Sequence, residues 1–288
     1  MKLTIGMANY GDAQGAWWTL SSLRLHHVPL TDTDVELLVI DDMPTANQDL
    51  AIACGHAKAR YIHASKNRGP AHAKNSVFEH AKGEHILLLD SHVLLSIGHV
   101  EQIKKLIDSV CLGDDMWVGP LVNESGNVIA TELLPELRGG MLGVWHTRQQ
   151  APPWFEVEAH GTAYMLMRRE AWPQFSQDFR GFSGEEVYIH EKVRRNGGSV
   201  LCHNQLRWCH RFMRFGVPVQ YCLTLNDKYR NHLIAAYEMA WSVTQMRDYF
   251  RRRLPLDQAV VVEAEVEAIH PDIWTRQIVG CREFRMHD

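Results

Sequence analysis

Short apolar runs alternate with amphipathic segments along the first third of the chain. The runs are LTIGMA (3–8), VELLVID (35–41), RYIH (60–63) and HILLL (85–89). The segments between them carry apolar side chains at helical spacing, over 15–27, 46–58 and from Pro70 onward. Apolar strands separated by amphipathic helices are typical of a parallel sheet covered on both faces. The pattern therefore predicts an α/β fold.

The second half of the chain is less regular. Residues 120–160 are predicted to be long loops with a few short strands. The next predicted elements are a strand and short helix over 161–172, a helix over 184–196 and a long helix over 228–253. We therefore expect a domain over residues 1–215 and a mainly helical extension over 216–288 that packs on it.

Polar side chains follow three of the apolar runs, at the points where the predicted strands end. They are Asn9-Tyr10, Asp41-Asp42 and Asp90-Ser91-His92. The carboxyl ends of parallel strands meet at one edge of a sheet, and ligands of such sheets bind there. The sequence therefore predicts a binding site at this edge.

The triplet Asp90-Ser91-His92 has the chemistry of a metal site. A carboxylate and an imidazole two residues apart, just after a buried strand, can both face one cation. A nucleotide diphosphate needs such a cation to neutralise its phosphates and its departing charge. An aspartate at a strand end can also simply cap a turn, so the triplet alone leaves both interpretations open.

The sequence around the triplet resembles the donor-binding half of GT-A fold (Rossmann-like) glycosyltransferases of the family-2 type. Residues 66–95 read KNRGPAHAKNSVFEHAKGEHILLLDSHVLL. The family pattern is N-x-G-x-x-x-A-R-N, then A-x-G-E and an apolar strand ending in D-x-D; Lys74 here replaces the usual arginine. The variant D-S-H resembles the polypeptide N-acetylgalactosaminyltransferases. That resemblance implies Asp90, His92 and a distant His210 as metal ligands.

Further segments extend the resemblance in order along the chain. Residues 35–44, 161–169, 181–198 and 206–212 resemble the family's second strand, sugar-pocket strand, acceptor-side helix and third-ligand segment. The resemblance implies a mostly parallel GT-A sheet flanked by helices, a UDP-sugar donor, and Mn²⁺ or Mg²⁺ as cofactor. Mn²⁺ is the better match to a mixed set of oxygen and nitrogen ligands. The implied donor contacts are Ala8, Tyr10, Asp41, Arg68, Lys74, Asp90, Ser91 and Gly161, with Asp42 as the alternative to Asp41 for the base.

Glu185 and Glu186 stand at the predicted start of the helix over 184–196. By resemblance, an acid there is either the base that deprotonates the acceptor or a residue that positions donor and acceptor. Acidic residues also stabilise the first turn of any helix, which is the structural alternative. We predict a catalytic role for at least one of them.

Composition adds few constraints. The chain has 288 residues, 45% of them hydrophobic, and a net charge of −4. We find no signal-like start and no apolar run long enough to span a membrane, so we expect a cytoplasmic protein without a membrane partner. Pairs such as Cys202-His203 and Cys209-His210 fit no standard zinc spacing. Residues 6–15 lack the basic Gly-rich loop of a nucleotidylyltransferase, which is the first rival activity.

The acceptor is the open question. Residues 187–253 carry twelve basic and four acidic side chains, although the chain as a whole is acidic. Such a segment can bind phosphates, and loop tryptophans can stack on an extruded base. One alternative acceptor is therefore a hydroxylated, for example hydroxymethylated, base in DNA rather than a protein or glycan. A second alternative is a non-catalytic module that binds carbohydrate or nucleic acid.

Overall fold

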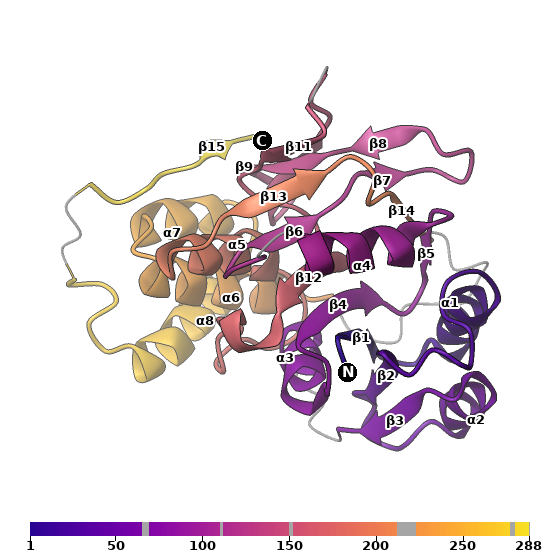
Figure 1. The fold of residues 1–288 in the computed structure, drawn as a ribbon. Coiled ribbons are helices and arrows are strands. Elements are labelled where there is room, and N and C mark those ends of the chain that lie inside the picture. The colour runs from indigo at the N-terminus through magenta and orange to yellow at the C-terminus, as the bar shows by residue number, and fades with distance from the viewer. Residues whose placement is uncertain (65–68, 110–111, 150–151, 212–222, 277–279, 288) are drawn as a thin grey trace.

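The computed structural model describes residues 1–64, 69–109, 112–149, 152–211, 223–276 and 280–287 (Figure 1). Within these ranges an eight-stranded sheet forms the centre, in the order β11-β13-β6-β12-β4-β1-β2-β3. Its strands are β1 (Leu3–Asn9), β2 (Val35–Asp41), β3 (Arg60–His63), β4 (His85–Asp90), β6 (Met116–Val118), β11 (Trp154–Glu156), β12 (Tyr164–Arg168) and β13 (Val200–His203). Strands β3, β2, β1 and β4 run parallel to one another, whereas β12 pairs antiparallel with β4. The predicted mostly parallel α/β sheet is confirmed.

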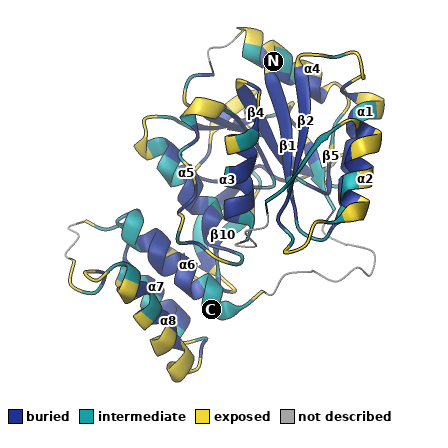
Figure 2. Ribbon diagram, turned by 90° about the horizontal axis from the view of Figure 1, so that it is seen from below, coloured by how far each residue is buried: buried dark blue, intermediate teal, exposed yellow. Residues whose placement is uncertain are grey.

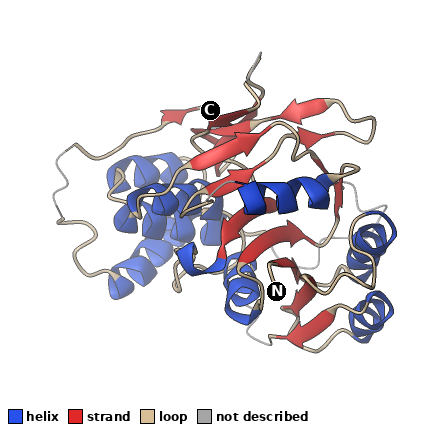
Figure 3. Cartoon of the chain, viewed as in Figure 1, coloured by secondary structure: helices blue, strands red, loops and turns tan. Residues whose placement is uncertain are grey.

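Helices cover both faces of this sheet (Figures 2 and 3). The helices are α1 (Ala13–His26), α2 (Gln48–Ala57), α3 (Pro70–His80), α4 (His99–Ser109), η1 (Arg169–Ala171), α5 (Glu185–Arg195), α6 (Leu225–Glu238), α7 (Val243–Arg251) and α8 (Leu256–Ile269). Successive side chains of a strand point to opposite faces. Accordingly Leu87 and Leu89 of β4 join a core with α1, α2 and α4, whereas Ile86 and Leu88 join one with α3 and α5–α8.

Two smaller sheets flank the central one. A four-stranded sheet contains β5 (Val93–Leu95), β7 (Leu121–Val122), β8 (Val128–Ala130) and β14 (Trp208–His210). A three-stranded sheet contains β9 (Glu132–Arg138), β10 (Met141–His146) and β15 (Arg285–Met286). The pairing of β14 with β5 sets His210 against Val93, next to the end of β4. This contact brings a residue from late in the chain to the predicted site.

The prediction of long loops over 120–160 is wrong in part, because β9 and β10 form an antiparallel hairpin there. Gly139 and Gly140 make its turn with φ angles of 58° and 76°. Pro135 lies inside β9, where a proline ordinarily argues against a strand. These residues explain why the pattern favoured loops.

The predicted single helix over 228–253 is also wrong. The chain turns at Ala240, which has a φ of 47°, and the side chain of Ser242 starts α7 by accepting from the amide of Gln245. Trp241 in the break is 1% exposed and packs edge-to-face on Phe284. Burial of this indole outweighs the helical propensity of the flanking residues.

Candidate active site

The ends of β1, β2 and β4 open into a pocket of about 740 Å³. The register of the parallel strands sets Ala8 opposite Asp90 at this edge. The pocket is lined by Ala8, Tyr10, Asp90 and Ser91. These residues lie at the sheet edge where the parallel strands end, which is where the sequence predicted a binding site. The pocket is also lined by Lys74 and Gly161 from the predicted donor set.

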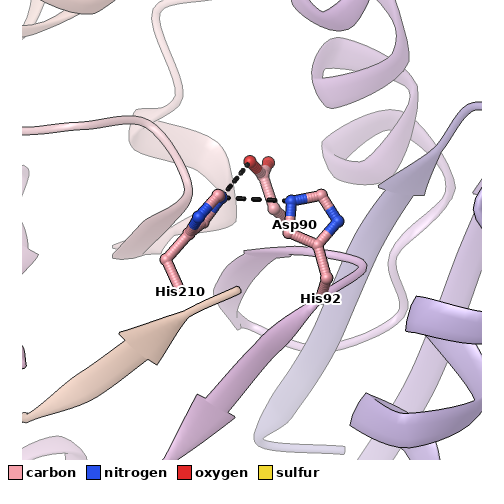
Figure 4. Close-up of side chains that lie close together, drawn as sticks. All are labelled: Asp90, His92 and His210. Atoms are coloured by element: carbon pink, nitrogen blue, oxygen red, sulfur yellow. Dashed lines mark hydrogen bonds and ion pairs between the residues drawn. The ribbon is translucent and has the colours of Figure 1, made fainter. Parts of the chain in front are cut away.

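Asp90, His92 and His210 converge on one point of the pocket (Figure 4). The Nε2 atoms of His92 and His210 are 3.1 Å apart, and Nε2 of His210 is 3.6 Å from Oδ2 of Asp90. One ligand atom from each residue lies within 4.8 Å of the other two, a separation that a single ion can bridge. A divalent cation would take the place of the hydrogen bond that joins the two ring nitrogens, so the arrangement fits such an ion.

The ring of His92 is oriented by an aspartate that sequence reasoning missed. Oδ2 of Asp12 lies 2.9 Å from Nδ1 of His92, and both side chains are buried. The same carboxylate caps α1 by accepting from the amide of Gly15. A carboxylate that accepts Nδ1–H leaves Nε2 free of a proton and directed toward a metal. An aspartate before a predicted helix was the available signal for Asp12.

Lys74 projects from α3 into the same pocket and is 4% exposed. Its Nζ donates to Oγ1 of Thr162 at 2.6 Å and lies 3.6 Å from Oδ1 of Asp90. Burial alone would raise the pKa of Asp90, but the Lys74 ammonium and the two imidazoles outweigh it and hold the pKa well below its usual range. Asp90 is therefore an anion ready to bind a cation.

Glu185 and Glu186 begin α5 and also line the pocket. Burial, followed by the neighbouring charge of Glu186, raises the pKa of Glu185 to about 8. Burial also raises the pKa of Glu186. Carboxyl groups that hold a proton near neutral pH inside a pocket are common in catalytic sites.

An aromatic wall closes part of the pocket. Trp145 on β10 is 40% exposed and lies so close to Gly161 that a Cβ on that glycine would be 2.6 Å from its ring. The ring packs edge-to-face on buried His160. Gly161 therefore determines where the Trp145 ring sits.

The structure changes the assignment of the base contact. Asp41 is fully buried and does not line the pocket, because its carboxylate accepts from the amides of Met43 and Asn47 and from the hydroxyl of Tyr61. Asp42, the alternative, lines the pocket. The carboxylate of Asp41 thus has a structural role in the turn after β2, which favours Asp42 for the base contact. Arg68, another predicted donor contact, lies outside the described residues.

A second group of potential metal ligands in the described part of the chain already uses carboxylate oxygens in hydrogen bonds. Asp178, Glu238 and His270 lie within 4.8 Å of one another, but the carboxylate oxygens of Glu238 accept hydrogen bonds from Ser176 and Tyr188. Among the described residues, neither Cys202 nor Cys209 belongs to a cluster with metal-ligand geometry. The zinc interpretation therefore gains no support.

The basic segment over 187–253 is partly neutralised by acids outside it. Arg251 of α7 donates to both carboxylate oxygens of Glu263 on α8 at 2.6 Å, and Arg247 lies 3.3 Å from the same carboxylate. Arg230 likewise pairs with Glu265. The charge count over this segment therefore overstates the number of cations available to a phosphate backbone.

The sequence profile of glycosyl transferase family 2 matches residues 4–171, more than half of the chain. The chain belongs to glycosyl transferase family 2. The resemblance to this family inferred from the motifs is thus confirmed. A comparison with curated protein sequences gave no significant match.

Solved structures share the fold of this family-2 glycosyltransferase. GalNAc-T7, crystallised with UDP, GalNAc and Mn²⁺, is 16% identical, with a TM-score of 0.65 over 94% of this chain. TarS residues 1–349 from S. aureus are 15% identical, with a TM-score of 0.58 over 96% of this chain and 81% of that one. The mannosyltransferase PcManGT from Pyrobaculum calidifontis, with GDP-Man and Mn²⁺, is 14% identical, with a TM-score of 0.51 over 93% of this chain and 75% of that one.

These similarities confirm the predicted GT-A fold with its C-terminal helices. The family-2 chain spans about half of GalNAc-T7, or 55% of that chain. None of the described helices is both long and apolar enough to cross a bilayer.

Proposed function

We propose that this family-2 glycosyltransferase moves a sugar from a UDP-sugar to an acceptor hydroxyl with the help of a divalent metal. The observation that carries the proposal is the convergence of Asp90, His92 and His210 in a pocket at the strand ends. The UDP and Mn²⁺ named for GalNAc-T7 support it, as does the sugar nucleotide and Mn²⁺ of PcManGT. A UDP-sugar is chosen over a GDP-sugar because the D-S-H motif resembles the N-acetylgalactosaminyltransferases.

Asp90, His92 and His210 would hold the metal. One oxygen and two nitrogen ligands suit Mn²⁺ better than Mg²⁺, which prefers oxygen alone. When bound, the ion would neutralise diphosphate charge and favour its departure. Asp12 keeps the His92 ring in the required orientation.

The remaining pocket residues would bind and orient the donor. Asp42 would accept from the uracil, while Ala8 and Tyr10 lie beside it along the strand edge. Lys74 carries a buried positive charge next to Asp90, where it would attract phosphate. Ser91 and Gly161, which also line the pocket, would contact the sugar.

Glu185 and Glu186 would act on the acceptor. Their position at the start of α5 lets one carboxylate accept the hydroxyl proton or align the hydroxyl with the anomeric carbon. We place the catalytic unit in residues 1–215, with 216–288 as an extension packed on it. A cytoplasmic location stays a prediction.

We propose that the acceptor is a hydroxyl group of a protein or glycan. The alternative acceptor is a hydroxylated base in DNA. The ion pairs of Glu263 with Arg247 and Arg251 weaken the argument for DNA. Trp145, half-exposed in the pocket, can stack on a sugar as well as on a base.

The test is nucleotide release and sugar transfer by the purified chain. It is incubated with UDP-sugars, Mn²⁺ and panels of peptides, glycans and hydroxymethylated duplex DNA. Asp90→Ala, His92→Ala and His210→Ala should each abolish transfer and weaken UDP binding. Full activity in excess chelator would contradict the proposal. UDP binding without any release or transfer would favour the non-catalytic module, and transfer to the duplex alone would select DNA.

A further inference from the structure

The loop over residues 180–184, which leads directly into Glu185, is held by a residue of helix α6. Asn231 is 1% exposed. Its Oδ1 accepts from the amide of Arg180 at 3.1 Å, and its Nδ2 donates to the carbonyls of Arg180 and Ser183 at 2.7 and 2.8 Å. Asn231 therefore contacts both ends of the loop.

A carboxamide is the side chain that these contacts require. The side chain must accept from one backbone N–H and donate to two backbone carbonyls in a buried place. Asn supplies one oxygen acceptor and two N–H donors, whereas a carboxylate supplies acceptors alone. An aspartate at this position would leave both carbonyls facing negative charge.

The backbone of the loop needs such external support. Gly181, Ser183 and Gly184 have positive φ angles of 59°, 87° and 95°. Positive φ is unfavourable for a residue that has a Cβ, such as the buried Ser183. Strained conformations of this kind persist when the surrounding structure over-determines them. A Cβ on Gly184 would lie 2.9 Å from the Cβ of Asn231, so loop and helix are in tight contact.

Further contacts hold the loop from both sides. Nε of Arg180 donates to Asp227 of α6 at 2.6 Å, and its NH2 group lies 2.8 Å from Glu265 of α8. On the other side, a Cβ on Gly69 would lie 2.2 Å from the carbonyl oxygen of Gly181. The loop is thus enclosed between the start of α3 and the C-terminal helices.

We propose that Asn231, assisted by Arg180, is a positioning residue that fixes the loop over 180–184 and thereby the acids Glu185 and Glu186 at the acceptor side of the pocket. This inference rests on the proposed function. It makes α6 part of the catalytic machinery, although α6 belongs to the C-terminal extension and lies beyond the residues that the family profile matches.

The test compares Asn231→Asp with Tyr237→Phe. Tyr237→Phe is a matched control, because it removes a hydrogen bond to Asp272 from the far end of the same helix. We expect Asn231→Asp to lower kcat on the order of 100-fold, the effect of misplacing catalytic groups by about 1 Å. The affinity for UDP with Mn²⁺, measured by calorimetry, should stay close to wild type, because the proposed metal and donor residues lie outside the loop over 180–184. Tyr237→Phe should leave kcat unchanged.

Two further variants keep the test decisive. Asn231→Ser keeps one hydrogen-bond donor in a smaller side chain. Arg180→Ala removes the ion pairs of Arg180, whose side chain is 44% exposed, so we expect this variant to fold. Both should lower kcat without a matching loss of UDP affinity. Wild-type kcat in a folded Asn231 variant, or in Arg180→Ala if neither Asn231 variant folds, overturns the inference. Equal losses of kcat and UDP affinity would indicate a general structural role and also overturn it. Failure of the proposed function is separate, because the wild type would then show no transfer.

Discussion

Asp12 and His92 form a buried pair in which Oδ2 of the carboxylate lies 2.9 Å from Nδ1 of the ring. Because Asp12 is also the residue that caps α1, the start of that helix fixes the direction of His92, a proposed metal ligand from a different strand–loop unit. The other nitrogen of the ring, Nε2, then faces His210.

The first prediction concerns this pair. Asp12→Asn keeps a good helix cap but removes the negative charge that orients His92. We expect Mn²⁺ affinity to fall roughly 10- to 100-fold, as for other partners of metal-bound histidines, with little change in folding. Isothermal titration with Mn²⁺ measures it, and Glu101→Gln, an exposed acid in the first turn of α4, is the control. Unchanged affinity in Asp12→Asn would refute the role of this pair.

The second prediction separates Asp42 from Asp41. Asp42→Asn should weaken UDP binding roughly 10- to 100-fold, which matches the loss of a charge-assisted hydrogen bond. Asp41→Asn should instead lower the free energy of unfolding, by about 1–3 kcal/mol, because the amide NH₂ would replace one of the two acceptor oxygens and face the N–H of either Met43 or Asn47. Calorimetry with UDP and GDP, beside urea unfolding, checks both. The reverse pattern would restore Asp41 as the base contact.

The third prediction concerns the acids at the start of α5. Glu185→Gln or Glu186→Gln, whichever removes the proton acceptor, should lower kcat by roughly 100- to 10,000-fold and leave UDP affinity nearly unchanged. The folded pKa of Glu185 is raised to about 8, so this carboxyl contributes a loss of stability as pH rises from 4.5 to about 8, opposite in sign to the buried histidines. Glu185→Gln should remove that contribution, seen in thermal melts as a difference from the wild type that grows with pH. Near-normal kcat in both variants would exclude a catalytic role.

The fourth prediction concerns buried histidines. Burial lowers the pKa of His99 and His190 to about 3, and that of His160 and His232 to about 4, from 6.5. The unfolded chain therefore binds protons below pH 6.5 that the folded chain does not, and stability falls as pH drops from 6.5 toward 4. Each histidine contributes a slope of at most about 1.4 kcal/mol per pH unit.

Urea unfolding of the chelator-treated protein at several pH values measures that slope. His232→Gln should reduce it by about one histidine's share, whereas His56→Gln, at an exposed position, should not. Identical slopes for His232→Gln and the wild type would show that His232 is not neutral in the folded state.

The predictable part of the fold is the part whose side-chain pattern is dictated by burial. The runs over 35–41 and 85–89 are buried on both sheet faces, so their composition identified them as strands. The break between α6 and α7 could not be predicted this way. It depends on the burial of Trp241 against Phe284, 43 residues apart in the chain, and not on a local helix-stop signal.

The predictable part of the site is the part that carries family motifs. Asp90, His92 and His210 stand in recognisable segments, whereas Asp12 is the N-cap residue before α1 and Asn231 is a single polar residue within α6. Their partners lie 80 and about 50 residues away, respectively. No local spacing rule connects such pairs, and the choice between Asp41 and Asp42 required knowing which carboxylate the turn after β2 already uses.

The ion pair of Lys74 with Asp90 has a consequence for how the protein acquires its metal. A buried acid without a partner would make the folded state depend on the ion, as in small zinc domains. Here the ammonium of Lys74 already compensates the negative charge of Asp90. The proposed metal could therefore bind after folding and dissociate without unfolding the protein. We expect the wild type to remain folded in excess chelator, and its melting temperature to rise less on addition of Mn²⁺ than that of Lys74→Met, because in the variant the ion would also compensate the charge of Asp90. A wild-type protein that unfolds in chelator would instead make the ion a structural component.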